Sequence, residues 1–176
     1  MPEEAWISIG SNIEPEHNLP QAVQQLHRVG KLLQVSNVYQ NPAIGRENQP
    51  DFLNAAALLE TDKDAWEIRA ILREIEAALK RVRSEYKYAP RTIDLDLCIL
   101  GSQVIETPEF TIPDPEIPLR SHLIVPLAEL NPHMVHPTIG ERLVDLADKT
   151  IIGADLIPRP DIARKLQQAL RKPGPD

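Results

Sequence analysis

The chain has 176 residues, of which 42% are hydrophobic and 26% charged, and its formal net charge is −7. This length is enough for one well-buried domain, and the acidic balance argues against general nucleic-acid binding, which needs a basic surface. The single cysteine excludes an internal disulfide. No apolar run approaches the ~20 residues that span a membrane, and the acidic N-terminus is not typical of a signal peptide, so we expect a cytoplasmic protein without a membrane partner.

Alternating and helical patterns predict the elements of the first third of the chain. A strand over residues 5–10 is followed by a helix over residues 18–29. A second strand is expected over residues 33–39, and the following loop, residues 40–51, is rich in Pro, Gly and Asn. A third strand over residues 52–60 completes this part.

The longest predicted helix begins after a cap at Thr61 or Asp62 and ends near Val82. Its apolar stripe has helical spacing and consists of Ile68, Ile71, Leu72, Ile75, Leu79 and Val82. The later patterns predict two strands and three helices, at residues 93–99, 104–106, 121–130, 141–147 and 162–170.

The order β-α-β-β-α-β is that of the ferredoxin-like α+β fold, an antiparallel sheet with helices on one face. We expect the opposite face to lack helices, with long loops folding over it as an active site. We assign residues 1–157 to one domain and residues 158–176 to a C-terminal extension, made of a short helix and a frayed end.

Asp94 and Asp96 lie on the polar face of the strand predicted over residues 93–99. They are roughly 6.5 Å apart at ~3.3 Å rise per residue, and Asp is depleted in strands. Two like charges beside a core repel each other unless a cation lies between them, and Mg²⁺ prefers carboxylate oxygens. The pair therefore indicates a Mg²⁺ site, the alternative being a solvated face paired with Lys or Arg.

A basic run lies immediately before this strand. With Glu85 as its one acidic residue, it holds Lys80, Arg81, Arg83, Lys87 and Arg91. Cations beside paired carboxylates in an acidic chain indicate a site where metal and arginine share the charge of a polyphosphate. The run could also complement the C-terminal end of a helix, and both interpretations can hold at once.

The chain resembles the 6-hydroxymethyl-7,8-dihydropterin pyrophosphokinase family of folate biosynthesis, and the most specific motif of this resemblance is Pro90-Arg91-Thr92-Ile93-Asp94-Leu95-Asp96. The resemblance extends to about residue 140 and rests on several blocks in order. They include Ile9-Gly10-Ser11-Asn12, Gln49-Pro50-Asp51-Phe52-Leu53-Asn54, Arg81-Val82-Arg83 and Val125-Pro126-Leu127. The family transfers the terminal pyrophosphate of ATP, as one unit, to the hydroxymethyl oxygen of the pterin and leaves AMP.

The resemblance implies a role for each matching residue. Asp94 and Asp96 would hold two Mg²⁺ ions, and Arg81 and Arg91 would be the catalytic arginines. Contacts to ATP, the co-substrate, are implied for Glu76, Arg83, Tyr88, Leu97, Thr111 and Arg120. Contacts to the pterin are implied for Asn41, Ile44, Phe52, Asn54 and His122, with Phe52 and His122 stacking on its two faces. The expected partners are these small molecules alone, and we expect a monomer.

Four residues depart from the family's usual pattern: Asp114 stands for His, His122 for Phe, Tyr88 for Trp and Ala89 for Gly. Residues 141–176 match no part of the family. Two other functions stay open from the residues alone. One is a Mg²⁺-dependent nucleotidyl- or phosphotransferase with another acceptor, and the other is a non-catalytic ferredoxin-like domain that binds a metabolite.

Overall fold

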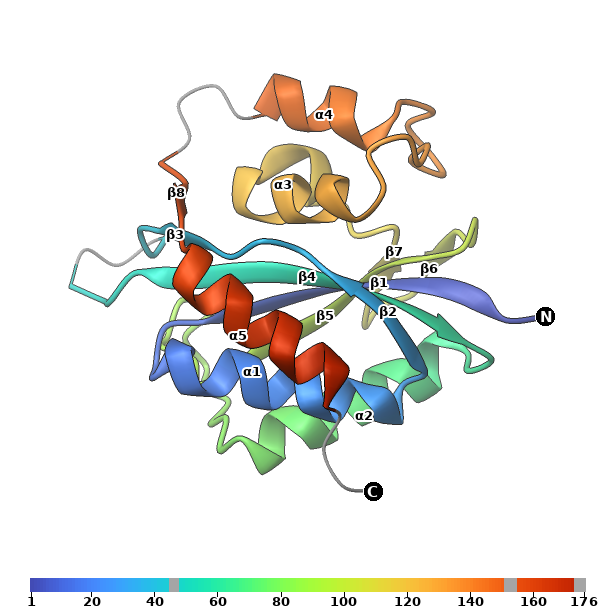
Figure 1. Ribbon diagram of the computed structural model, residues 1–176. Coiled ribbons are helices and arrows are strands. Elements are labelled where there is room, and N and C mark those ends of the chain that lie inside the picture. Colours follow the sequence, from blue (N-terminus) through green and yellow to red (C-terminus); the bar gives the residue numbers. More distant parts are fainter. Residues whose placement is uncertain (45–47, 151–154, 173–176) are drawn as a thin grey trace.

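The computed structural model describes residues 1–44, 48–150 and 155–172, in which a sheet lies between two layers of helices (Figure 1). The strands of the sheet are β1 (Glu3–Ser11), β2 (Lys31–Val35), β3 (Tyr39–Asn41), β4 (Phe52–Thr61), β5 (Asp94–Leu100) and β8 (Ile157–Pro158). They follow the order β5-β1-β4-β3-β8, with β2 also paired to β4. All these pairings are antiparallel. A separate hairpin consists of β6 (Ile105–Glu106) and β7 (Thr111–Ile112).

Helices lie on both faces of the sheet (Figure 1). One face is covered by α1 (Pro15–Gln25), α2 (Ala65–Ala78) and α5 (Pro160–Arg171). The other is covered in part by α3 (Ser121–Leu130) and α4 (Leu143–Thr150). Two short 3-10 helices span Leu26–Arg28 and Ile117–Leu119. Within the described residues, every helix is too short or too polar to cross a bilayer.

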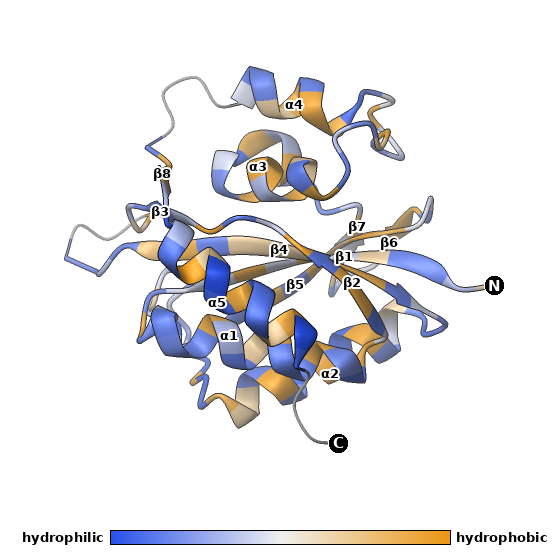
Figure 2. Ribbon diagram, in the orientation of Figure 1, coloured by the Kyte–Doolittle hydropathy of each residue, from blue (hydrophilic) through white to orange (hydrophobic). Residues whose placement is uncertain are grey.

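The larger core lies between the sheet and the layer of α1, α2 and α5. Successive strand residues point to opposite faces, and Ile7, Ile9 and Leu95 point into this core with at most 1% of their surface exposed. Hydrophobic and hydrophilic residues alternate along α5, as Figure 2 shows, because the helix has one buried side. The helices contribute Leu19, Val23, Ile68, Leu72, Ile162 and Leu166 to the core.

The opposite face of the sheet is divided along the length of its strands. At one end Trp6, Ala56 and Cys98 are fully buried in a second core beneath α3 and α4. At the other end the same alternation brings polar residues to the surface of the sheet. These are Ser8, Asn54, Asp94 and Asp96. The β-α-β-β-α-β order is therefore confirmed, whereas the expectation that no helix covers this face is wrong for the end that packs under α3.

The ends of α2 differ from those that its apolar stripe predicts. Asp64, rather than Thr61 or Asp62, caps the helix: its carboxylate accepts the Glu67 N–H, and Glu67 accepts the Asp64 N–H, both at 2.9 Å. The helix ends at Ala78, and Lys80 has a positive φ of 63°. The basic run therefore lies in the loop after α2. Lys80 and Arg81 come directly after the end of the helix, where cations can complement its dipole, and the other cations lie beyond it.

The remaining differences concern boundaries. α1 begins at Pro15, a residue suited to the first helical position, three residues before the predicted start. The strand predicted over residues 33–39 is two strands, β2 and β3, which both pair with β4. The last helix is confirmed as α5. The expected frayed end at residues 173–176 and the middle of the predicted loop, residues 45–47, lie outside the described residues.

Candidate active site

A cleft opens at the polar end of the divided sheet face. Its floor consists of Ser8 and Gly10 of β1, Asn54 of β4, and Asp94 and Asp96 of β5. Its walls come from β3, the start of β4, the first turn of α3 and the loops, and they include Asn41, Ile44, Phe52, Tyr88, Arg91, Asp114, Arg120 and His122. The structure therefore brings both predicted metal ligands together with all five predicted pterin contacts.

Asp94 is neutralised by two of the predicted arginines. Arg81 Nη1 lies 3.2 Å from Asp94 Oδ1, and Arg91 Nη1 lies 2.5 Å from Asp94 Oδ2. Burial alone would raise the pKa of Asp94, but the charges of Arg91 and Arg81 and their hydrogen bonds lower it below its usual value. The Arg81 side chain is 9% exposed, and its buried Nε has no hydrogen-bond partner among the described residues.

Asp96 is in a different electrostatic position. Arg73 Nη2 lies 3.5 Å from its Oδ1, a weak contact. Burial, followed by the charge of Asp94, raises the pKa of Asp96 to about 7. Its carboxylate is nevertheless 42% exposed, toward the cleft. A carboxylate with too little positive charge around it is suited to binding a cation.

The two carboxylates do not by themselves complete a metal site. Within the described ranges, no group of three Asp, Glu, His or Cys side chains is close enough together to hold an ion. Mg²⁺ usually keeps several waters and takes one or two carboxylates together with substrate phosphates. Asp94 and Asp96 fit that pattern, because the cleft leaves room beside them for oxygens that are not part of the protein.

Glu76 organises the arginines from inside the protein. Its side chain is 1% exposed, at the end of α2, and it lines none of the clefts. Glu76 Oε1 accepts from Arg73 at 2.8 Å and from Arg83 at 2.5 Å, while Oε2 accepts from Arg81 at 3.3 Å and from the Leu95 N–H at 2.9 Å. The structure thus shows this predicted ATP contact as the common anchor of three guanidinium groups.

A second cleft adjoins the first and shares Asp96 and Asp114 with it. Two of the residues predicted to contact ATP, Leu97 and Thr111, line this second cleft. Two others, Tyr88 and Arg120, line the first cleft. Arg83 lies beside Arg81 and Arg91 at a third opening. The predicted ATP contacts are therefore spread around the two carboxylates rather than gathered in a single pocket.

The predicted pterin contacts form a compact group. The side-chain amide of Asn54 donates to Asn41 Oδ1, and Asn41 pairs with Phe52 between β3 and β4. Gly10 lies directly beside Asn54, since a Cβ at position 10 would come within 2.8 Å of Asn54 Oδ1. A larger residue there would displace the amide, so Gly10 belongs to the architecture of this side.

All four departures from the family's pattern, Tyr88, Ala89, Asp114 and His122, line the first cleft. Burial, and then the charge of Arg120, lowers the pKa of His122, so its ring is neutral at pH 7. Burial raises the pKa of Asp114, and the charges of Glu116 and Asp94 act in the same direction. Asp114 therefore adds a third carboxylate to the electrostatics of the site instead of pointing away from it.

Arg69 and Phe110, which line the second cleft, are not among the site residues predicted from the sequence. The guanidinium carbon of Arg69 lies 4.2 Å from the centre of the Phe110 ring, and Trp66 meets the same ring edge-on at 5.3 Å. Arg73 is also absent, although it precedes Glu76 by one helical turn. Helical spacing could have indicated both arginines, because Arg73 lies one turn and Arg69 two turns before Glu76 on the predicted helix.

Comparison with known proteins identifies relatives. Residues 6–132 match the family model described as 7,8-dihydro-6-hydroxymethylpterin-pyrophosphokinase. The 2-amino-4-hydroxy-6-hydroxymethyldihydropteridine pyrophosphokinase of Bacillus subtilis is 36% identical over 129 residues, covering 72% of this chain and 77% of the relative. The enzyme of the same name from Haemophilus influenzae is 33% identical over 155 residues, covering 84% of this chain and 96% of the relative.

Solved structures are similar in fold. The wild-type HPPK-DHPS of Plasmodium falciparum superposes with a TM-score of 0.70 at 12% identity, covering 86% of this chain. This chain spans only 44% of that protein's length. At this identity the similarity shows the fold alone, and nothing is carried over from the part that this chain does not match.

Proposed function

Because the chain belongs to the 7,8-dihydro-6-hydroxymethylpterin-pyrophosphokinase family, we propose that the cleft above β1, β4 and β5 is where it carries out the family's reaction. The chain is an ATP-dependent pyrophosphokinase of folate biosynthesis. It transfers pyrophosphate from ATP to 6-hydroxymethyl-7,8-dihydropterin and yields AMP and the pterin diphosphate.

Asp94 and Asp96 are our candidates for holding two Mg²⁺ ions. The raised pKa of Asp96, caused by burial and by Asp94, supports this because it reports unbalanced negative charge at the cleft floor. Mg²⁺ bound there supplies neutralisation of the triphosphate charge. Asp114 is close enough to influence the pKa of Asp96 and adds to the same negative field.

Arg81 and Arg91 are our candidates for the catalytic groups. In the reaction the pterin hydroxymethyl oxygen forms a bond to the β-phosphorus, while the bond from that phosphorus to the oxygen bridging the α- and β-phosphates breaks. Negative charge develops on the bridging oxygen as it leaves with AMP. Guanidinium groups that are already positioned beside the carboxylates, as Glu76 and Asp94 position these two, can stabilise that charge.

The two substrates meet at the carboxylates in this proposal. ATP lies toward Leu97, Thr111, Arg83, Tyr88 and Arg120, with Glu76 acting through the arginines it anchors. The pterin lies between Phe52 and His122, where the neutral imidazole offers a flat stacking surface. The amides of Asn54 and Asn41, linked to each other, can match donors and acceptors on the ring edge, with Ile44 beside them.

Three broader proposals complete the picture. Residues 1–157 form the catalytic domain and residues 158–176 its extension. The enzyme acts as a monomer. Its dependence on ATP favours a cytoplasmic location.

The observation that carries the proposal is the meeting of Asp94, Asp96, Arg91, Asn54 and His122 in one cleft. The test is incubation of the protein with ATP, Mg²⁺ and 6-hydroxymethyl-7,8-dihydropterin, followed by separation of the nucleotides. AMP that forms only when the pterin is present supports the assignment. ADP or free pyrophosphate as the product would instead indicate a transferase with another acceptor, and binding without turnover would indicate a metabolite-binding domain.

A further inference from the structure

The C-terminal part of the chain, beyond the residues that match the family, forms a clasp on the pterin side of the cleft. We use "C-terminal clasp" for β8, Arg159 and α5. β8 pairs with β3, so that Gln40 lies opposite Ile157 and Tyr39 opposite Pro158. The Arg159 N–H then donates to Val38 O at 2.8 Å and extends the pairing by one bond.

The side chain of Arg159 connects this clasp to Gln40. Its Nη1 donates to Gln40 Oε1 at 3.0 Å, and Nη2 donates to Glu16 Oε1 at 3.2 Å. Nε and Nη2 also bind the two oxygens of Asp161, at 3.1 and 2.9 Å. These hydrogen bonds position the guanidinium group, and those to Asp161 and Glu16 also raise the pKa of Arg159.

Gln40 in turn binds Asp51, at the end of the loop that joins β3 to β4. Its Nε2 donates to Asp51 Oδ2 at 2.9 Å. Gln40 comes immediately before Asn41, and Asp51 immediately before Phe52. Two consecutive hydrogen bonds, from Arg159 to Gln40 and from Gln40 to Asp51, therefore hold the residues that immediately precede Asn41 and Phe52.

β3 itself needs such support because it is three residues long. Strands this short have little stability of their own, and β8 covers the edge of β3 that faces away from β4. The clasp is anchored at its other end, where Ile162 and Leu166 of α5 are at most 1% exposed and Gln167 Nε2 donates to Val35 O at 3.3 Å.

We propose that Arg159 is a positioning residue for pterin binding, acting through Gln40 to hold Asn41 and Phe52 in register with Asn54. This inference rests on the proposed placement of the pterin at Asn41, Phe52 and Asn54. It assigns a function to a segment that the family model does not include. Within the described residues, the side-chain hydrogen bonds of Arg159 and Gln167 reach none of the residues proposed to contact ATP, so the effect is expected mainly on the pterin.

The test uses the full chain with Arg159→Met, which keeps the aliphatic stem and the backbone N–H and removes every side-chain donor. Steady-state kinetics gives kcat and the KM of each substrate. Titration calorimetry gives pterin affinity in the presence of α,β-methylene-ATP, whose methylene group replaces the bridging oxygen that must leave. Loss of about one net hydrogen bond predicts that pterin affinity weakens roughly fivefold to tenfold, while the KM for ATP changes less than twofold.

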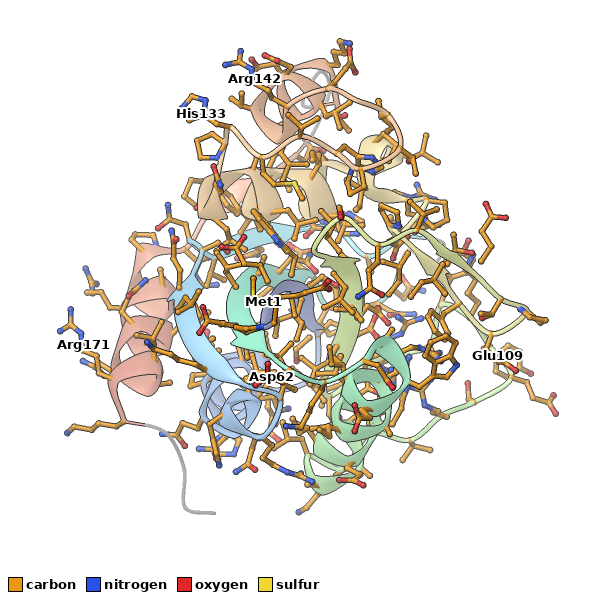
Figure 3. All side chains as sticks on the ribbon, turned by 90° about the vertical axis from the view of Figure 1, so that its right-hand side faces the viewer. Met1, Asp62, Glu109, His133, Arg142 and Arg171 are labelled. Carbon is orange, nitrogen blue, oxygen red and sulfur yellow. The ribbon has the colours of Figure 1, made fainter. Side chains whose placement is uncertain are left out.

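Arg142→Met is the matched control. Arg142 also binds both oxygens of a carboxylate, Asp145, at 2.9 and 3.1 Å, and it lies at the outer end of the α4 layer, away from α5 (Figure 3). This variant is expected to leave both substrate affinities unchanged. Thermal unfolding of both variants shows whether either loses the fold.

A second variant, Gln40→Leu, tests whether Arg159 acts on the pterin site through Gln40. If Arg159 acts through Gln40, the double variant binds the pterin no more weakly than the weaker single variant. Equal pterin affinity in wild type and Arg159→Met overturns the inference, as does an equal loss for both substrates that follows the melting temperature. If the wild type forms no pterin-dependent AMP in the same assay, the proposed function fails instead, and the two failures are distinguishable.

Discussion

Replacement of Glu76 by Gln is expected to destabilise the protein strongly. The two oxygens of Glu76 accept four hydrogen bonds, two each, and its side chain is 1% exposed. An amide has one oxygen, so whichever way it is placed, two donors face an NH₂ group that cannot accept. At least one of these is a guanidinium, and a hydrogen bond to a charged group contributes roughly 1.5–3 kcal/mol.

Adding the loss of the buried negative charge among Arg73, Arg81 and Arg83, we expect the free energy of unfolding to fall by about 3 kcal/mol. For a chain of this length that corresponds to a drop of roughly 6–12 °C in melting temperature. Urea titration gives the free energy, and calorimetry gives the melting temperature. The turnover rate should also fall, because Arg81 loses one of the acceptors that hold it over Asp94.

Glu74→Gln provides the control on the same helix. Glu74 forms an ion pair with Arg28, with side chains 62% and 35% exposed, and exposed pairs of this kind contribute at most about 1 kcal/mol. If Glu76→Gln and Glu74→Gln lower the stability equally, the argument that Glu76 is the buried anchor of the arginines is refuted.

The other predictions concern the cleft directly. Asp94→Asn or Asp96→Asn should abolish turnover at saturating Mg²⁺ without loss of fold, and near-normal AMP formation by either would exclude it as a metal ligand. The raised pKa of Asp96 means that the folded protein binds a proton there more tightly than the unfolded chain does. The free energy of unfolding of the metal-free protein should therefore decline as pH rises from about 4 to about 7, and Asp96→Asn should weaken that decline in melting curves recorded across this range. Arg91→Ala should slow single-turnover transfer by roughly 10²–10³ with a smaller change in ATP affinity, and Lys should restore little of it, whereas a normal rate with weak ATP binding would make Arg91 a binding group only. Since the pKa of His122 is lowered, pterin affinity should be constant above about pH 6.5 and weaken only in more acid solution; His122→Phe should remove this dependence, and parallel titration curves for the two proteins would place His122 away from the pterin.

Sequence patterns predicted the elements whose signals are local. The alternation around Asp94 and Asp96 located β5, and the spacing of Ile68, Leu72 and Ile75 located α2, because each pattern follows from burial of one side of a regular element. The end of α2 was misplaced because Val82 continues the apolar spacing although it is 80% exposed. Backbone geometry at Lys80 ends the helix, and apolar spacing carries no information about it.

Elements that depend on distant partners could not be predicted in this way. β8 has two residues, one of them Pro158, and it is a strand only because β3 lies beside it. The anchoring role of Glu76 could be predicted in part. Position 76 follows Leu72 by four residues, so the helical pattern already placed this carboxylate on the buried side of α2, where a charge requires partners. The arginines that supply them come from α2 and from the loop that follows it.

The arginines and the carboxylates of the cleft constrain one another. Arg81 and Arg91 are directed at Asp94, whereas Asp96 has Arg73 at 3.5 Å and keeps a raised pKa, caused by burial and by Asp94. The Arg91 N–H that binds Asp94 cannot bind a phosphate oxygen at the same time. A guanidinium that turns to the nucleotide leaves Asp94 to be neutralised by another positive charge, and a cation between Asp94 and Asp96 would neutralise both carboxylates. Nucleotide and metal binding should therefore reinforce each other, and the protein's own charges, rather than either ligand alone, produce that coupling.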